Sequence, residues 1–311
     1  MQSVLVLGAA GRIGRAVAEA FRDAGWRVKG QVRPGGAGRL GAGIEPVEAN
    51  GADAEALARA GADVDVVFHG LNPIYTRWKQ DMTPLADAAI AAAAANRALL
   101  LLPGNVYNFG ARMPERLTPD APFRPTTSKG RLRVKLEDRI AAAAQRKGFK
   151  IGVLRAGDFF GGAGPGSWFD LVLAKDLAKD RFTRPAPPGL IHAWAYVPDL
   201  AAAFVRLAEA RDRLGTVERF HFTGHAVTME DMAAAVEAAV GRPLEVKALP
   251  WGMLRLVAVF MPMMRALLEM KYLWDVPHRL VDDRLEAFTG PLPATPLNRA
   301  VAEALAAMTV D

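Results

Sequence analysis

The 311-residue chain contains no cysteine, which excludes disulfide bonds and metal sites built on thiolates. Histidine and acidic residues do not cluster with the spacing of metal ligands either, so we predict no metal. Aromatic residues make up only 8% of the chain, and no stretch interleaves them with basic residues. Although the net charge is +6, the arginines are scattered, and we therefore expect no nucleic-acid partner.

Long apolar runs are also missing. The best candidate for a membrane segment, residues 256–264, contains Pro262 and lies between Arg255 and Arg265. It is much shorter than the roughly 20 residues that a membrane-spanning helix needs. The N-terminus has no basic region, and its apolar run is too short for a secretion signal. These absences predict a cytoplasmic protein with no membrane partner.

The rest of the composition is typical of a globular protein with a substantial core. Hydrophobic residues make up 51% of the chain and charged residues 23%. The length allows one large domain or two modest ones. No internal repeat is present, and no linker separates independent domains.

The most informative stretch lies at the N-terminus, where an apolar run at residues 4–7 is followed by Gly8, Gly11 and Gly14. The pattern predicts a buried parallel strand that passes into a helix through a tight glycine turn. Gly8 permits the sharp turn, Gly11 lets the backbone approach a pyrophosphate, and Gly14 lets the helix sit close to the strand. We therefore predict a dinucleotide site at the helix start, where free N–H groups attract phosphates.

The end of the second predicted strand, residues 26–32, indicates which dinucleotide binds. An NAD site places an acidic residue here to hold the ribose 2′-hydroxyl. This chain has no acidic residue between Asp23 and Glu45 and carries Arg33 instead, with Arg12 in the glycine turn. Two guanidiniums suit a 2′-phosphate through charge-assisted hydrogen bonds, so we predict NADP(H), with NAD less favoured. The alternative is that both are surface arginines.

Strands and helices alternate along most of the chain with short connections, which predicts an α/β protein with a Rossmann doubly wound parallel sheet and a small C-terminal α/β cap. Asp53 is predicted to cap a helix over 54–59. Thr83 is predicted to cap a helix that begins with Pro84 and ends at Ala95. Further strands are expected near residues 44–47, 64–69, 98–102, 151–154 and 220–222.

We predict two structural units. Residues 1–160 with 190–224 form the NADP-binding Rossmann domain, and residues 161–189 with 225–311 form the substrate-binding cap. The cap contains a methionine-rich apolar segment at residues 251–274. Methionine side chains fill irregular pockets, so this segment is expected to wall an apolar substrate site, and a homodimer surface is the alternative.

Several residues that follow predicted strands are expected near the dinucleotide. Asn50 is placed to bind the adenine, although a simple turn asparagine is nearly as well supported, and His69 is expected to be a hydrogen-bonded core histidine. Gly70 and Asn72 leave the fourth strand beside the expected cofactor. The complete predicted cofactor set is Gly8, Gly11, Arg12, Ile13, Gly14, Arg33, Asn50, Gly70, Asn72 and Arg133.

Four motifs resemble the short-chain dehydrogenase/reductase superfamily, in its extended or atypical branch, often labelled epimerase/dehydratase. The glycine turn is the first, and residues 106–110 are similar to the family's Val-Tyr-Gly after the fifth strand. Residues 155–161 resemble its Arg-Pro-x-Asn-x-Tyr-Gly segment, and residues 196–201 its Val-x-Asp-x-Ala helix start. The resemblance implies the Rossmann fold and a nicotinamide dinucleotide.

The acid–base residues of that family are replaced in this chain. The resemblance implies a Tyr-x-x-x-Lys pair on one helix face and a serine or threonine near the end of the fifth strand. Aligned by Glu137, the pair falls on Lys129 and Arg133, and the serine position falls on Pro103. A Tyr-x-x-x-Lys does occur at residues 75–79, one element too early, and we interpret it as a chance match.

Three hypotheses for function stay open. In the first, an NADP(H)-dependent oxidoreductase acts on a small, moderately apolar substrate, with Lys129 as proton donor, Arg133 on the ribose and Tyr107 beside the substrate carbonyl. The isoflavone-reductase-like members of the superfamily do use a lysine in this way. In the second, the chain is a non-catalytic NADP(H)-sensing regulator, as the nitrogen-metabolite-repressor-like members are. The third is a nucleotide-sugar epimerase or dehydratase, which the missing acid–base pair disfavours.

Five residues are expected near the substrate. Asn105 and Asn108 follow the fifth strand, Asp158 follows the sixth, and His192 and Trp194 belong to a loop before a helix. The alternatives are a helix N-cap for Asp158 and core packing for Trp194.

Overall fold

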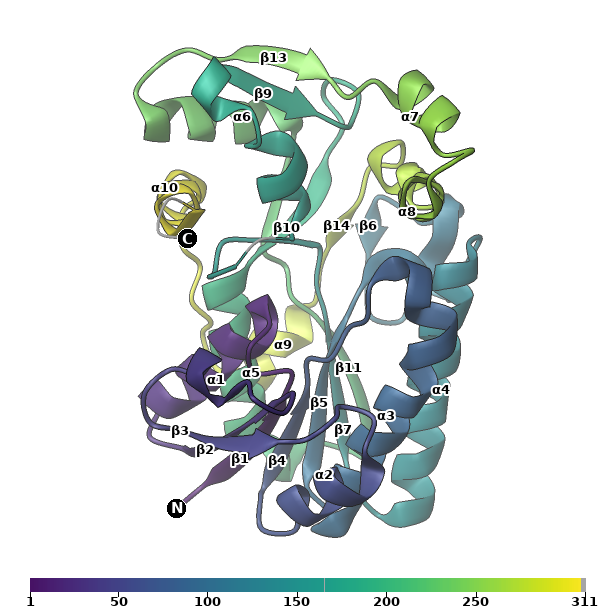
Figure 1. Cartoon of the computed structure of the whole chain (residues 1–311), viewed down its shortest axis with the longest axis vertical. Helices are drawn as coiled ribbons and strands as arrows, with labels where there is room; N and C mark the ends of the chain where they lie inside the picture. Colours follow the sequence, from purple (N-terminus) through teal and green to yellow (C-terminus); the bar gives the residue numbers. More distant parts are fainter. Residues whose placement is uncertain (165, 309–311) are drawn as a thin grey trace.

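The computed structural model describes residues 1–164 and 166–308, and its centre is a sheet of seven parallel strands (Figure 1). The strands are β1 (Ser3–Leu7), β2 (Arg27–Val32), β3 (Ile44–Glu48), β4 (Val66–His69), β5 (Leu99–Gly104), β7 (Ile151–Arg155) and β11 (Val217–His221). Their order is β11-β7-β5-β4-β1-β2-β3. The order reverses between β1 and β4, and open α/β sheets bind ligands at such a point, beyond the carboxyl ends of the strands.

Helices cover both faces of this sheet. One face carries α2 (Ala54–Gly61), α3 (Trp78–Ala95) and α4 (Ser128–Lys147), and the other carries α1 (Arg12–Asp23) and α5 (Val197–Glu209). Leu5 and Leu7 of β1 pack toward the first face, and Val4 and Val6 pack toward the second. Every residue of β1 is buried because successive side chains enter opposite faces that are both covered. The predicted doubly wound Rossmann sheet is confirmed.

The start of α3 differs from the sequence prediction. The helix begins at Trp78, so Thr83 and Pro84 lie inside it, and the predicted start at Pro84 is wrong. Trp78 and Met82 are buried and anchor the additional turns in the core. Pro84 has no N–H for the carbonyl of Gln80, but both residues are exposed, so solvent satisfies that carbonyl. The other predicted cap, Asp53 on α2, is confirmed: its side chain accepts from the N–H of Ala56.

The part of the chain above the sheet in Figure 1 contains three small sheets. Their strands are β8 (Asp158–Phe160), β10 (His192–Tyr196) and β12 (His225–Val227); β9 (Arg181–Arg184) and β13 (Glu245–Ala248); and β6 (Arg116–Leu117) and β14 (Arg279–Leu280). The loop predicted around His192 and Trp194 is therefore wrong. These residues form β10, whose backbone pairs with both β8 and β12 and whose five residues are all buried.

Four helices complete this upper part: α6 (Met229–Val240), α7 (Trp251–Val257), α8 (Pro262–Leu268) and α10 (Leu297–Met308). The helix α9 (Asp283–Thr289) instead packs against α5 and β11 on the face of the large sheet. The upper part has its own aromatic core, which includes Phe160, Phe169, Phe182, Trp194 and Trp274. A separate core supports our proposal that this part acts as a cap on the Rossmann domain. In the described residues, every helix falls short of the length and apolar character that a bilayer crossing requires.

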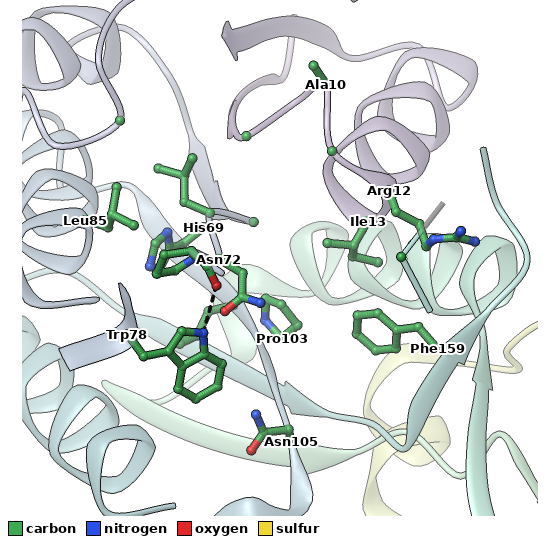
Figure 2. Close-up of a pocket in the computed structure, with 18 of the residues that line it drawn as sticks. Ala10, Arg12, Ile13, His69, Asn72, Trp78, Leu85, Pro103, Asn105 and Phe159 are labelled. Atoms are coloured by element: carbon green, nitrogen blue, oxygen red, sulfur yellow. Dashed lines mark hydrogen bonds between the residues drawn. The ribbon is translucent and has the colours of Figure 1, made fainter. Parts of the chain in front are cut away.

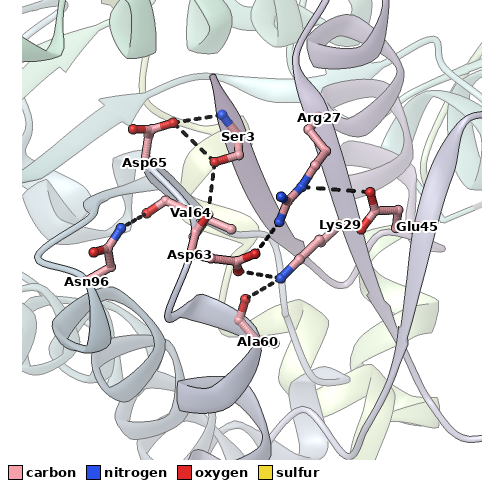
Figure 3. Close-up of polar contacts among 9 residues, drawn as sticks. All are labelled: Ser3, Arg27, Lys29, Glu45, Ala60, Asp63, Val64, Asp65 and Asn96. Carbon is pink, nitrogen blue, oxygen red and sulfur yellow. Dashed lines mark hydrogen bonds and ion pairs between the residues drawn. The ribbon is translucent and has the colours of Figure 1, made fainter. Parts of the chain in front are cut away.

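Polar contacts tie the strands together at their amino-terminal ends (Figure 3). The backbone N–H of Ser3 donates to Asp65 at 2.8 Å, and Asp63 forms ion pairs with Arg27 and Lys29. Hydrogen bonds from Lys29 and Arg27 lower the pKa of Asp63 to about 2. These charges lie at the end of the sheet opposite the ligand-binding edge, so we assign them a structural role.

Candidate functional site

A cavity of about 1080 Å³ runs along the carboxyl ends of the strands. Figure 2 shows Arg12, Ile13 and Phe159 on one side of it and His69, Leu85 and Trp78 on the other. Twelve residues that the sequence analysis selected line this cavity: Gly8, Gly11, Arg12, Ile13, Arg33, Asn50, Gly70, Asn72, Asn105, Tyr107, Arg133 and Asp158. The predicted dinucleotide residues and part of the predicted catalytic set therefore share one space.

The glycine turn has the backbone that a pyrophosphate cradle requires. Gly8 adopts a φ of 78°, which disfavours any residue with a side chain, and the N–H of Gly11 donates to its carbonyl at 2.9 Å. A Cβ at Gly14 would lie 2.1 Å from the carbonyl oxygen of Gly8. Gly14 lies behind the turn, where it allows the close approach of α1 to β1, as predicted.

A buried glutamine holds this turn in place. Gln31 accepts a hydrogen bond from the N–H of Gly8 at 2.9 Å and donates one to the carbonyl of Ala49 at 2.7 Å. It is 1% exposed. Because β2 delivers Gln31 to the turn, the next two residues place Arg33 at the rim of the cavity.

The rim beyond β2 is basic and free of acidic lining residues within the described part of the chain. Arg33 and Arg39 both line the cavity there and are exposed, with Pro34, Gly35 and Gly36 between them. Arg39 was not predicted. The signal for it was a second arginine in the same glycine-rich loop, which the sequence analysis left aside.

Arg12 lies on a different part of the cavity wall from Arg33. Its guanidinium forms an ion pair with Asp170 and donates to the carbonyls of Gly161, at 2.6 Å, and Gly164. These acceptors belong to the loop after β8 and to the π-helix η4 (Phe169–Leu173). Arg12 therefore links the glycine turn to the cap, and its guanidinium is already engaged there.

Two tyrosines meet at the other end of the cavity. The hydroxyls of Tyr75 and Tyr107 lie 2.7 Å apart, and the Tyr107 ring stacks on Trp78. Tyr75 begins the short 3₁₀ helix η2 (Tyr75–Arg77), just before α3. The indole N–H of Trp78 donates to the carbonyl of Pro73 at 2.8 Å, which is the dashed line in Figure 2. Tyr75, the first residue of the Tyr-x-x-x-Lys match at residues 75–79, therefore lines the cavity.

Burial controls the protonation of this tyrosine pair. It raises the pKa of Tyr75 to about 12 and the pKa of Tyr107 well above its usual value. Both phenols are therefore protonated at neutral pH. Each hydroxyl carries one hydrogen. One of the two hydroxyls donates its hydrogen in the shared hydrogen bond, so the other hydroxyl keeps its own hydrogen and can donate it toward the cavity.

Arg133 and His69 place buried polar atoms at the cavity wall. Arg133 donates to the carbonyl of Pro103 at 2.6 Å, and its Nε has no hydrogen-bond partner among the described residues. The Nδ1 of His69 also lacks a partner in that part of the chain, so the predicted hydrogen-bonded core histidine is wrong. Burial, with the charge of Arg133, lowers the pKa of His69 to about 4. The imidazole is neutral at physiological pH.

Lys129 lies outside the cavity lining. It is buried, and its Nζ is 2.5 Å from a carboxylate oxygen of Glu269. The same Nζ lies 5.2 Å from the centre of the Tyr75 ring. The ammonium therefore lies near the ring of Tyr75 and does not line the cavity.

Asp158 reaches the cavity with a histidine behind it. The Nε2 of His192 lies 2.8 Å from an Asp158 carboxylate oxygen, and the imidazole stacks on Trp274 with ring centres 4.1 Å apart. His192 and Trp194 are both fully buried and do not line the cavity. His278, which was not predicted, does line it. The N-cap alternative for Asp158 is wrong, because Asp158 is in β8 and caps no helix.

Two predicted asparagines make local contacts. Asn108 is buried outside the cavity lining, and its side chain donates to Glu137 at 2.9 Å. Asn50 lines the cavity, but its side-chain oxygen accepts from the N–H of Ala52, as in a turn. The methionine-rich segment 251–274 contributes no lining residue, so the expectation that it walls this cavity is wrong.

Together, the seven-stranded parallel sheet and the glycine turn at its carboxyl edge define a Rossmann-like α/β fold, as the sequence predicted. Residues 1–99 match the model of the NmrA-like family. No curated protein matches the sequence significantly.

Solved structures of similar fold cover nearly the whole chain. A candidate epimerase from Burkholderia cenocepacia J2315 is 22% identical, with a TM-score of 0.76, over 100% of this chain and 99% of that one. The enzyme WbmH from Bordetella bronchiseptica, solved with NAD+, is 19% identical, with a TM-score of 0.76, over 99% and 98%. UDP-glucose 4-epimerase from Bifidobacterium longum, solved with NAD+ and UDP, is 16% identical, with a TM-score of 0.76, over 100% and 99%.

Proposed function

We propose that this protein binds NADP(H) and catalyses a redox reaction on a small, moderately apolar substrate. One observation carries the proposal: a single cavity joins the glycine turn and Arg33 to the Tyr75–Tyr107 pair. This arrangement supports dinucleotide recognition and proton donation within one space.

The residues present fit a nicotinamide dinucleotide. Gly8 and Gly11 line the cradle without side chains, and Arg33 and Arg39 would hold the 2′-phosphate. The unpartnered Nε of Arg133 and Nδ1 of His69 would face the ribose and nicotinamide end. When bound, the nicotinamide supplies or accepts a hydride.

The chain's own residues handle the proton. Tyr107, kept protonated by burial, donates a hydrogen bond to the substrate oxygen and then its proton, while Tyr75 hydrogen-bonds the resulting phenolate. The nearby guanidinium of Arg133 stabilises that negative charge. Asp158 holds a polar group of the substrate. Lys129 lies near the Tyr75 ring, and it is the competing candidate for proton donor.

Replacing Tyr107 by phenylalanine is expected to lower kcat about 100-fold or more, because general acids contribute roughly that much. The Kd for NADPH should stay unchanged, since the ring and its stacking on Trp78 are kept. Turnover with a panel of carbonyl compounds and NADPH fluorescence titrations measure the two effects.

Lys129→Met is the paired test of the competing candidate. It should change kcat far less than Tyr107→Phe. A variant Lys129→Met that is inactive beside a fully active Tyr107→Phe would assign the proton to Lys129 instead.

Replacing Arg33 by alanine is expected to weaken NADPH binding by about 10- to 100-fold, the range for a charge-assisted hydrogen bond. NADH affinity should change little because that cofactor lacks the 2′-phosphate. Arg59→Ala, an exposed arginine paired with Glu55 away from the cavity, is the matched control. Equal affinities for NADPH and NADH in both the wild type and Arg33→Ala would contradict the NADP assignment.

Two other functions are each favoured by one observation. The NmrA-like match of residues 1–99, with Lys129 in place of the family tyrosine, supports a non-catalytic NADP(H)-sensing regulator. Tight NADPH binding without turnover of any carbonyl compound would select it. The epimerase neighbours support a nucleotide-sugar epimerase. Interconversion of UDP-sugars by the purified protein would select that function.

A further inference from the structure

The α7–α8 hairpin, residues 251–268, projects from the upper edge of the molecule (Figure 1). It carries most of the large apolar side chains that the described structure exposes. The most exposed are Phe260 at 86%, Leu256 at 73%, Val259 at 64% and Met253 at 57%. Single exposed apolar residues are ordinary, but a contiguous group of this kind marks an interaction surface.

The charge of the same segment has one sign. Within residues 251–268 the only charged residues are Arg255 and Arg265. The adjoining acidic residues are paired, Glu245 with Lys247 and Glu269 with Lys129. Both arginines are exposed. The surface therefore combines an apolar tip with basic flanks, which is complementary to an anionic surface that has an apolar interior.

The hairpin is too short to cross a bilayer. Each of its helices has seven residues, and Pro262 starts the second. Its geometry suits a segment that lies in the plane of a membrane interface, with apolar side chains at the boundary between headgroups and acyl chains.

We propose that the α7–α8 hairpin docks this protein onto anionic lipid bilayers. Leu256, Val259 and Phe260 enter the interface, and Arg255 and Arg265 contact lipid phosphates. The sequence analysis expected no membrane partner because it considered spanning segments only. A second copy of the chain is a less suitable occupant, since a twofold contact would bring the same basic residues together.

One end of the hairpin contacts a residue that lines the cavity, and the other end pairs with a residue next to the lining. Trp251 at its start lies 6.3 Å, ring to ring, from Trp168, which lines the cavity. Glu269 at its end pairs with Lys129, whose ammonium lies over the ring of Tyr75. Docking would bring this end of the cavity close to the bilayer, a source of apolar substrates. This consequence rests on the proposed function, whereas the docking itself does not.

The test is co-flotation of the full chain with phosphatidylcholine vesicles that contain either no phosphatidylglycerol or about one third of it. Wild-type protein is expected to float with the anionic vesicles. Phe260→Ser and Leu256→Ser should each weaken partitioning about tenfold or more, the loss expected from one buried large apolar side chain. Arg255→Gln should weaken partitioning onto the anionic vesicles by about fivefold, and added salt should also weaken it.

Leu171→Ser is the matched control, because Leu171 is 55% exposed and lies in η4, outside the hairpin. It should bind like the wild type. No flotation with anionic vesicles would overturn the proposal, and so would equal losses in Leu171→Ser and Phe260→Ser. A dimer that Phe260→Ser dissociates, without vesicle binding, would assign the hairpin to a second copy. No dinucleotide is present in these assays, so their failure is distinct from failure of NADPH binding or turnover.

Discussion

Replacing Glu137 by alanine is expected to lower the free energy of unfolding by about 3–5 kcal/mol, the range for breaking a buried ion pair. Glu137 is fully buried, and its carboxylate accepts from Arg155, itself 1% exposed, at 2.9 Å. Asn108 donates to it as well, and Arg219 lies 3.6 Å away. Its removal leaves the Arg155 guanidinium buried without its counter-charge. Urea unfolding at neutral pH measures the loss.

A surface pair provides the control for this experiment. Arg139 forms two hydrogen bonds with Asp87 between α4 and α3, but both side chains are about half exposed. Asp87→Ala should therefore cost less than about 1 kcal/mol. Losses of similar size in the two variants would contradict the assigned role of Glu137.

The buried pair also positions the site. Arg155 donates to the backbone carbonyl of Asn105, two residues before Tyr107, and Asn108 is bound to Glu137. The loop that carries Tyr107 is thus held from below by α4 and β7. The Glu137→Ala protein that stays folded should show a lower kcat than the wild type.

Acidification is expected to unfold the protein steeply between about pH 6 and pH 4. Burial lowers the pKa of His69 to about 4 and the pKa values of His221 and His278 to about 3. The same groups titrate near 6.5 when unfolded, so the unfolded chain binds up to three more protons in this window. The contribution of these histidines to the free energy of unfolding is fully present above pH 6.5. It decreases as the pH falls, by about 4 kcal/mol per pH unit for three histidines. Urea unfolding at pH 7.5, 6 and 5 measures this slope.

His221→Leu isolates one of the three groups. The Nδ1 of His221 donates to the carbonyl of Leu117, so the variant loses that hydrogen bond at every pH. It should also lose about one third of the slope. A slope identical to that of the wild type would show that His221 takes up its proton without unfolding.

Local patterns were enough to predict the sheet. The apolar run before Gly8 predicted a buried strand, and the burial of all of β1 confirms it. The cap Asp53 sits where the sequence places it, because the capping interaction spans only three residues. The start of α3 was missed because tertiary burial of Trp78 and Met82 outweighs the local preference of Pro84 for a helix start.

The pairing of Tyr75 with Tyr107 was harder to predict than the glycine turn. Tyr75 and Tyr107 are 32 residues apart, and only the packing of η2 against the loop after β5 brings their hydroxyls together. The Tyr-x-x-x-Lys motif at residues 75–79 was visible in the sequence, but it lies one structural element earlier than the resemblance to the family implies. For Arg12, the position in the glycine turn suggested a phosphate contact. In the structure its guanidinium instead forms an ion pair with Asp170, which is distant in the sequence.

The sequence by itself determined the strand–turn–helix unit at the N-terminus, with Gly8 in its turn, since this unit follows from contacts within a strand, a turn and a helix. Only the tertiary structure decided which side chains share the reacting end of the cavity and which cationic groups are already paired. Both depend on contacts between residues that are far apart in the chain. They also depend on burial, which shifts the pKa values of phenol, imidazole and guanidinium groups and so sets their protonation.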